Sequence, residues 1–144
     1  SLEQIMQKQR VSALMLNRKN AENLLIKRFK EGRNYWVFPG GGVEPEELLE
    51  QAIVREVFEE TSLRIDNYQE IFSVVNRGQK EHFYLVNVQF FEPKLSLHSP
   101  EGQTQSSSNR YELTWVKLND LSKLDLVPVE AKEIVNSLVS QARI

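Results

Sequence analysis

The chain has 144 residues, which is enough to bury a core within one domain. Its formal net charge of −2 argues against a general attraction to nucleic acid, and the lack of cysteine excludes disulfides, thiolate metal sites and cysteine nucleophiles. No apolar run approaches the roughly 18 residues that span a membrane, and no signal-peptide pattern is visible. We therefore expect one domain over residues 1–144, in a cytoplasmic protein with no membrane partner.

The first predicted elements are strands. Residues 10–17 and 24–29 are largely apolar and are separated by a polar turn, so they predict a β-hairpin. A short third strand is expected over 35–38 and leads into Pro39 and the glycines at 40–42. A run of glycines lets the backbone approach a ligand closely and adopt positive φ angles, although a plain turn has the same composition.

A helix is predicted over residues 47–61, which contain neither glycine nor proline. The Glu-Pro-Glu sequence at 44–46 suits its start, because proline is tolerated in the first turn and early acids complement the helix dipole. At roughly 100° per residue, one side of this helix is apolar and should face a core. That side carries Ile53, Val54, Val57 and Phe58.

Three acids, Glu56, Glu59 and Glu60, fall together on another side of the same helix. Like charges three or four residues apart destabilise a helix by roughly 0.2–0.5 kcal/mol per pair, and the dipole disfavours negative charge near a C-terminus. A solvated acidic face is one interpretation. The other is a missing partner, for which a hard divalent cation such as Mg²⁺ is the natural candidate.

Beyond the helix, residues 64–75 and 81–91 are expected to be strands, split by a turn over 76–80. His82 begins the second of these strands. Neither His82 nor His98 has metal-ligand spacing to another histidine, so a structural role is predicted for His82.

The last third of the chain alternates polar and apolar segments. Residues 96–110 form a long polar stretch, which is either a surface loop or a lid over a ligand. A strand is predicted over 111–118 and a connector over 118–128. A closing helix over 129–141 carries an apolar stripe that should pack on the core.

The glycine loop and the acidic helix share one spacing pattern. It resembles the signature of the Nudix hydrolase family, G-x5-E-x7-R-E-U-x-E-E-x-G-U, where U is a bulky aliphatic residue. The matching positions are Gly41, Glu47, Arg55, Glu56, Val57, Glu59, Glu60 and Leu63. Ser62 departs from the pattern, because the family has glycine there. A left-handed residue other than glycine costs roughly 1 kcal/mol, so we expect a local change in how the helix ends, without loss of the site.

The resemblance implies a fold and a reaction. The fold is an α/β/α sandwich around a mixed β-sheet, which agrees with the predicted order of elements. The reaction is the Mg²⁺-dependent hydrolysis of a nucleoside diphosphate linked to another moiety, with Mn²⁺ as an alternative cofactor. The implied metal ligands are Glu56, Glu59, Glu60 and the carbonyl of Gly40. Glu47 and Arg55 are implied to brace the loop against the helix through a salt bridge.

Several roles stay open at this point. The carboxylate that orients or deprotonates the attacking water is Glu56, Glu59 or Glu112, since the family often carries an extra acid at the place of Glu112; Glu101 competes for that role. Basic residues precede the glycines, and either Arg28 or Arg33 contacts substrate phosphates, or the cluster is an ordinary charged strand end. The position of Arg28 in this fold favours it.

The substrate is also open. ADP-ribose specialists tend to have a proline some way past the signature, and none occurs between Pro45 and Pro93. The tyrosine of dinucleoside polyphosphate specialists is matched only by Tyr84, which comes late, and the coenzyme A pattern is matched only in fragments. A nucleoside triphosphate, including an oxidised one, remains open, and a stacking role for Tyr35, Trp36 or Phe83 competes with core packing.

Other functions of the same fold agree less well with this sequence. A non-catalytic nucleotide-sensing module often lacks the acids that this chain retains. An isoprenoid diphosphate isomerase needs a cysteine, and this chain has none. A role in mRNA decapping needs a basic RNA-binding tract, which this sequence lacks. We expect a small nucleotide as the ligand and no nucleic acid partner; the oligomeric state is open, with a homodimer as one option.

Overall fold

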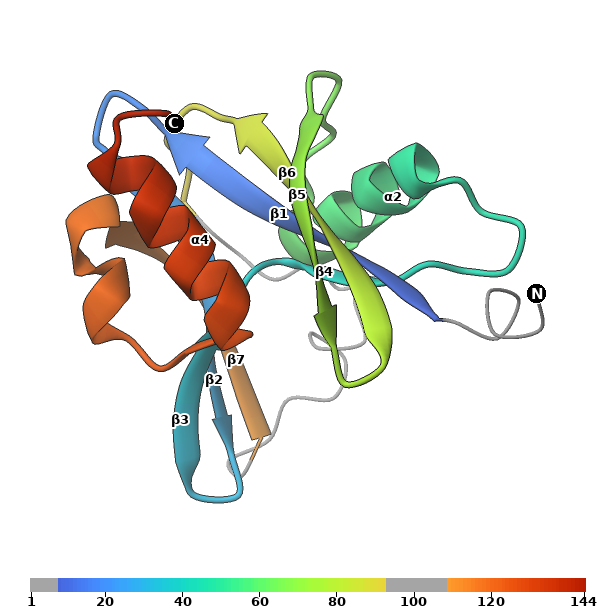
Figure 1. Ribbon diagram of the computed structural model, residues 1–144, viewed down its shortest axis with the longest axis horizontal. Helices are drawn as coiled ribbons and strands as arrows, with labels where there is room; N and C mark the ends of the chain where they lie inside the picture. Colours follow the sequence, from blue (N-terminus) through green and yellow to red (C-terminus); the bar gives the residue numbers. More distant parts are fainter. Residues whose placement is uncertain (1–7, 93–108) are drawn as a thin grey trace.

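The computed structural model describes residues 8–92 and 109–144, and within them eight strands, two α-helices and one short 3-10 helix (Figure 1). In chain order these are β1 Gln9–Asn17, β2 Glu22–Lys30, β3 Arg33–Val37, β4 Gly40–Gly42, α2 Leu49–Thr61, β5 Gln69–Asn76, β6 Gln79–Asn87, β7 Asn109–Lys117, η1 Leu118–Lys123, β8 Leu126–Val127 and α4 Val129–Ser140.

All eight strands belong to one mixed sheet. Its main path runs β5-β6-β1-β2-β3-β8, with β4 paired to β1 and β7 paired to β2. The β1–β6 and β3–β8 pairs are parallel, and the others are antiparallel. The predicted first hairpin is confirmed, because β1 and β2 pair with Met15 opposite Leu24.

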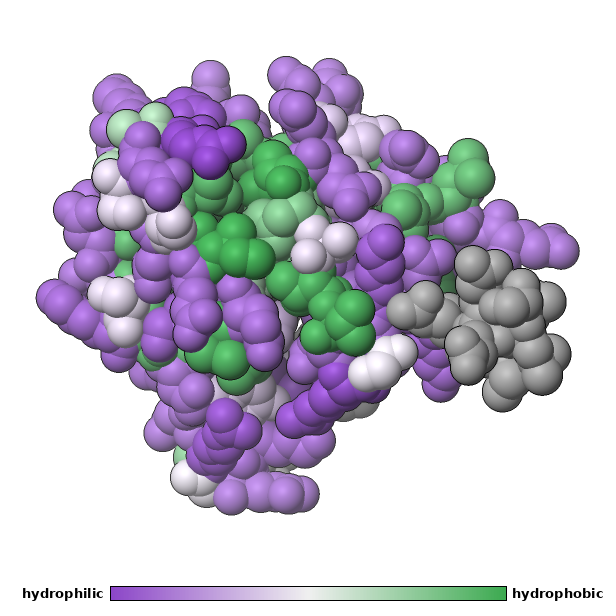
Figure 2. Space-filling model, in the orientation of Figure 1, coloured by the Kyte–Doolittle hydropathy of each residue, from purple (hydrophilic) through white to green (hydrophobic). Residues whose placement is uncertain are grey.

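Helices cover both faces of the sheet, which confirms the predicted α/β/α sandwich (Figure 1). One core lies under α2 and includes Ala52, Ile53 and Val57, three of the residues on its buried face. The second core lies under α4 and η1 and includes Ala131 and Val135. On the face viewed in Figure 2, hydrophobic atoms gather between α4 and the β5–β6 hairpin and are surrounded by hydrophilic atoms.

The first two strands stay paired only near one end. β1 and β2 pair from Met15–Leu24 to Asn17–Glu22. Away from that end, β1 runs beside β4 and β6, whereas β2 runs beside β3 and β7. The two groups of strands therefore diverge, and the β5–β6 and β2–β3 hairpins lie apart in Figure 1.

Several predicted boundaries differ from the structure. The strand expected over 64–75 begins only at Gln69, because Ile65 and Tyr68 pack into the core beside α2 instead of pairing with a strand. The strand expected over 81–91 ends at Asn87. The connector over 118–128 contains η1 and β8. Most of the predicted loop, residues 96–108, lies outside the described residues.

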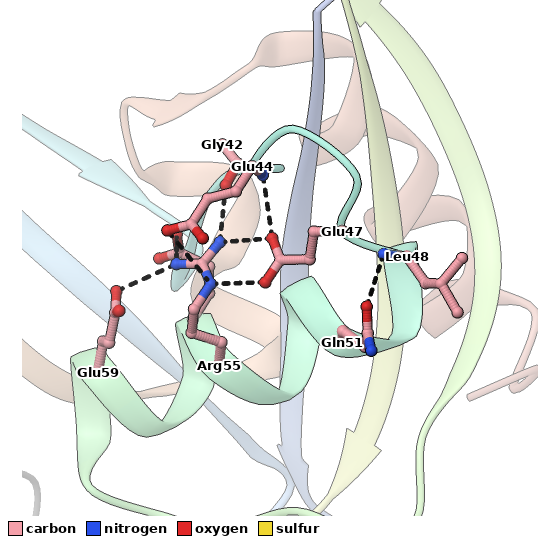
Figure 3. A network of polar contacts seen from close by, with 8 residues as sticks. Gly42, Glu44, Glu47, Leu48, Gln51, Arg55 and Glu59 are labelled. Carbon is pink, nitrogen blue, oxygen red and sulfur yellow. Dashed lines mark hydrogen bonds and ion pairs between the residues drawn. The ribbon is translucent and has the colours of Figure 1, made fainter.

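Helix α2 begins two residues later than predicted, and the local backbone explains the difference. Glu46 has φ 64°, which is incompatible with a helix. The helix then starts with the Leu48 N–H donating to Gln51 Oε1 at 2.9 Å (Figure 3). Gln51 thus satisfies one of the amide groups that a helix start leaves without a partner.

The end of α2 keeps the geometry of the family glycine. Ser62 adopts the left-handed conformation, with φ 65° and ψ 10°, and its N–H donates to Phe58 O at 2.8 Å. The expected change in how the helix ends is therefore wrong. The serine accepts the strained conformation, because its backbone bond closes the last turn.

Replacing Ser62 with glycine should stabilise the protein. Glycine has no Cβ to clash in the left-handed region, so we expect Ser62→Gly to raise the free energy of unfolding by about 1 kcal/mol. Urea unfolding followed by circular dichroism measures this difference. Ser62→Ala keeps a Cβ and should bring no gain, so an equal gain in both variants would contradict the explanation.

Candidate active site

The guanidinium of Arg55 joins helix α2 to the glycine loop (Figure 3). It donates two hydrogen bonds to Glu47, from Nε at 2.7 Å and from Nη2 at 2.9 Å. Nη2 also donates to the carbonyl of Gly42 at 3.0 Å. The brace between Glu47 and Arg55 that the resemblance implied is therefore present, and it is bidentate, which is the stronger geometry for this pair.

The same guanidinium contacts two of the predicted metal ligands. Arg55 Nη1 lies 2.8 Å from Glu56 Oε1 and 3.3 Å from Glu59 Oε2. Both carboxylates are largely buried, so a positive charge between them offsets much of their mutual repulsion. The sequence suggested that these acids lack a positively charged partner. In this structure Arg55 supplies that positive charge to Glu56 and Glu59.

Glu47 should make stability depend on pH. The hydrogen bond from Arg55 is the main cause that lowers the pKa of Glu47 from its ordinary value of 4.5. Because the pKa is lower in the folded state, the stabilisation is complete above the unfolded-state pKa and is lost as the pH falls through the folded-state pKa.

We therefore expect wild type and Glu47→Gln to differ most in free energy of unfolding at neutral pH, and to converge as the pH falls well below 4.5. Urea titrations at steps between about pH 7 and pH 3 give both curves. Parallel curves over that range would show that the ion pair with Arg55 contributes nothing to the acid sensitivity.

Two of the three glycines in the loop pack too tightly for a larger residue, whereas Gly42 has open space around it. A Cβ at Gly40 would overlap the carbonyl of Val11 and crowd Ser12, and a Cβ at Gly41 would overlap the carboxylate of Glu56. The missing side chains thus let β4 lie against β1 and let Glu56 reach the loop. The positive φ angles expected for these glycines are absent, because residues 40–42 form the extended strand β4. Their close approach to a ligand stays a prediction.

A cavity of about 510 Å³ opens between the diverging strands. Glu60 lines it although only 2% of this residue is exposed, and Gly40 lines it too. Glu60 and Gly40 therefore share this cavity, whereas Glu56 and Glu59 contact Arg55. The cavity is lined by Arg10, Ile26, Arg28, Arg33, Tyr35, Val37, Phe38, Gly40, Glu60, Asn76, Arg77, Gln79, Glu81, Tyr111, Val127, Pro128, Val129 and Glu130.

Both arginines predicted to bind substrate line this cavity. The guanidinium of Arg28 lies over the ring of Tyr111 at 4.1 Å and near that of Tyr35 at 5.4 Å. Its Nη2 donates to Asn109 Oδ1 at 3.3 Å, and its buried Nε has no hydrogen-bond partner within the described part of the chain. Arg33 lies on the neighbouring strand β3, with its guanidinium 4.7 Å from the Tyr35 ring, and it pairs with Asp125 at 3.2 Å.

The structure does not bring Glu112 to this site. Glu112 follows Tyr111 in β7, and alternate residues of a strand point to opposite faces. Tyr111 lines the cavity, so Glu112 lies on the other face, exposed and opposite Lys27 in the sheet register. A catalytic role for Glu112 therefore has no support from the geometry. Glu101, its competitor, lies outside the described residues.

His82 behaves as a structural residue, as predicted. It is buried, its Nδ1 lies 2.9 Å from Glu70 Oε2, and its Nε2 lies 2.7 Å from Gln9 Oε1. Tyr35 lines the cavity beside the guanidinium groups of Arg28 and Arg33, whereas Phe83 is fully buried between Phe38 and Phe72. Core packing is therefore the role of Phe83.

Sequence reasoning missed four charged residues of the cavity, namely Glu81, Arg10, Arg77 and Glu130. Glu81 is 5% exposed and accepts a hydrogen bond of 2.8 Å from the Ser12 hydroxyl. Arg10 lies 3.8 Å from Glu81, and Arg77 comes from the turn between β5 and β6. No local pattern marks these residues, although Glu81 occupies an inward position on a strand where an apolar residue is usual.

The donor atoms of the predicted metal ligands suit a hard divalent cation. The predicted ligands offer carboxylate and carbonyl oxygens and no sulfur, and Gly41 lacks the Cβ that would keep Glu56 from the loop. Across residues 8–92 and 109–144, no three acidic or histidine side chains are already grouped to hold a metal. A cation at this site would have to compete with Arg55 for Glu56 and Glu59.

Comparison with known proteins gives consistent matches. A family model described as "NUDIX domain" matches residues 6–138. The RNA pyrophosphohydrolase of Pectobacterium carotovorum subsp. carotovorum (strain PC1) is 26% identical over 129 residues, which cover 75% of this chain and 72% of that protein. The uncharacterized Nudix hydrolase YvcI of Bacillus subtilis (strain 168) is 31% identical over 99 residues, covering 69% of this chain and 61% of the relative.

Solved structures agree with the fold. A MutT structure from work on Aliivibrio salmonicida and Vibrio cholerae superimposes with a TM-score of 0.72 at 25% identity. The match covers 94% of this chain and 98% of that one. In the part of the chain that the structure describes, no helix has the length and apolar character needed to cross a membrane.

Proposed function

Since this chain belongs to the Nudix family, we propose that it is a pyrophosphohydrolase that cleaves nucleoside diphosphates linked to another moiety, with Mg²⁺ or Mn²⁺ as cofactor. The observation that carries the proposal is a single cavity that holds a buried carboxylate, Glu60, a glycine loop and several arginines. A bound diphosphate offers anionic oxygens to the arginines and oxygens that can share a metal with the carboxylate.

Glu60, Glu56, Glu59 and the carbonyl of Gly40 would hold the cation. When bound, a divalent cation neutralises charge on the phosphates and lowers the pKa of a coordinated water. Glu60 is the first choice among the ligands, because it already faces the cavity. Glu56 lies against the glycine loop, and both Glu56 and Glu59 contact Arg55, so a cation would have to share these two carboxylates with Arg55.

The other residues would bind and orient the substrate. Arg28 is held between aromatic rings, which fixes the plane of its guanidinium and favours a directed contact with phosphate. Arg33 lies next to it on β3 and is more exposed. Glu56 or Glu59 would then orient or deprotonate the attacking water; Glu112 has no part in this proposal, because it faces away.

A product-resolved hydrolysis screen tests the function. The panel contains nucleotide sugars, ADP-ribose, dinucleoside polyphosphates and normal and oxidised nucleoside triphosphates, each with Mg²⁺, with Mn²⁺ and with a chelator. Because one relative is named RNA pyrophosphohydrolase, an RNA with a 5′-triphosphate is included and also tests the expectation that no nucleic acid binds. We expect metal-dependent cleavage of a phosphate–phosphate bond in at least one substrate.

A nucleotide that binds without being cleaved would indicate a different function. If one nucleotide binds tightly and no phosphate is released with either metal, the chain is a nucleotide-sensing module instead. The cytoplasmic location and the homodimer stay predictions, which cell fractionation and light scattering of the purified protein test.

A further inference from the structure

Two arginines of the cavity, Arg10 and Arg77, have no role in the function proposed above. Arg10 lies on β1, and Arg77 lies in the turn between β5 and β6. Arg28 and Arg33 lie on β2 and β3. The two pairs of arginines therefore come from the two groups of strands that diverge beyond the short β1–β2 pairing.

The sheet register sets the pairs on opposite walls. Arg10 precedes Met15 on β1 and is paired with Gly42 and Glu81, whereas Arg28 follows Leu24 on β2 and is paired with Tyr35 and Tyr111. Gly40, on β4, is paired with Ser12 of β1 and lines the space between the walls. A ligand held at Gly40 and Glu60 thus has basic side chains on both sides.

Arg77 is placed at a strained position of its turn. Arg77 and Gly78 have φ angles of 53° and 75°, a pair of left-handed residues that favours Asn-Gly in a two-residue hairpin. Arginine is uncommon in that conformation. Within residues 8–92 and 109–144 Arg77 forms no ion pair, and it is exposed, so its charge is available to a ligand in the cavity.

Arg10 is only partly neutralised. Its Nε lies 3.8 Å from Glu81 Oε1, a distance beyond direct hydrogen bonding, and its side chain is 38% exposed. Glu81 in turn is held by the Ser12 hydroxyl. The guanidinium of Arg10 therefore retains donors that can turn toward an anion.

We propose that Arg10 and Arg77 form a second phosphate-binding subsite, and that the preferred substrates carry a chain of more than two phosphates. This inference rests on the proposed function of the same cavity. A two-phosphate substrate with a neutral second moiety places one phosphate on each side of the cleaved bond and leaves most of the second wall without a charged partner. Each added phosphate gains charge-assisted hydrogen bonds from that wall.

The test compares two substrates that differ only in the length of the phosphate chain. Diadenosine diphosphate and diadenosine tetraphosphate share both end groups. With Mg²⁺ present, we expect wild type to cleave the tetraphosphate with a kcat/KM at least about tenfold higher, and Arg77→Gln to lower this ratio by about tenfold. Arg77→Lys keeps the charge and should restore most of the ratio.

Matched controls separate the subsite from general charge effects. Arg143→Gln removes an exposed arginine outside the cavity and should leave the ratio unchanged. A ratio near one in wild type, or an unchanged ratio in Arg77→Gln, would overturn the proposal even if both substrates are cleaved.

If neither substrate is cleaved, the hydrolysis screen described above decides the proposed function, and binding decides the subsite. Inorganic tripolyphosphate is titrated into wild type and Arg77→Gln by calorimetry, without substrate turnover. A roughly tenfold weaker Kd in the variant supports the second subsite, and equal affinity overturns it.

Discussion

Glu60→Gln is expected to abolish metal-dependent hydrolysis while the protein stays folded. The substitution keeps the shape of a side chain that is 2% exposed and lines the cavity, but it removes the negative charge that a divalent cation needs. Loss of a group that merely supports a metal ligand costs about 10–100-fold. Loss of a ligand should therefore lower kcat/KM by on the order of 100-fold or more.

Two measurements separate this outcome from unfolding. Circular dichroism should give the wild-type spectrum, and the rise in Tm that Mg²⁺ produces in wild type should disappear in the variant. Glu50→Gln, an exposed acid in the first turn of the same helix, is the matched control and should retain both turnover and the Mg²⁺ effect. Near-native turnover in Glu60→Gln would refute the assignment of this carboxylate.

Arg55→Ala is expected to cause the largest loss of stability. One guanidinium contacts Glu47, Glu56 and Glu59 and the carbonyl of Gly42. Its removal leaves largely buried carboxylates without their cation, which costs about 3–5 kcal/mol in comparable cases. For a chain of this size that corresponds to a fall in Tm of roughly 6–20 °C.

The variant also tests whether the arginine and a metal compete. With the guanidinium gone, Glu56 and Glu59 repel each other more strongly, so Mg²⁺ should raise the Tm of Arg55→Ala by more than it raises the Tm of wild type. Arg55→Lys keeps one charge but loses the fork that binds Glu47, and an intermediate loss is expected. Equal Tm values for wild type and Arg55→Ala would show that the network contributes no stability.

Local patterns in the sequence were sufficient for the elements that carry the signature. The hairpin, the acidic helix and the glycine loop follow from hydrophobic periodicity, turn composition and fixed spacing. The brace between Glu47 and Arg55 and the structural role of His82 were also predicted. The end of the helix was not, because Ser62 keeps the left-handed geometry of a glycine; the cost of that conformation is smaller than the gain from closing the turn and packing the residues around it.

By itself, the sequence determined the signature and which face of α2 carries the acids, because both depend on spacing along one segment of the chain. The α/β/α architecture was predicted from the resemblance to the family, together with the order of the expected elements. Only the tertiary structure decided which residues share the cavity. The parallel pairing of β1 with β6 brings Arg10 beside Glu81, and a one-residue alternation in β7 turns Tyr111 inward and Glu112 outward. Register between distant strands is set by packing of the whole sheet, and no local pattern encodes it.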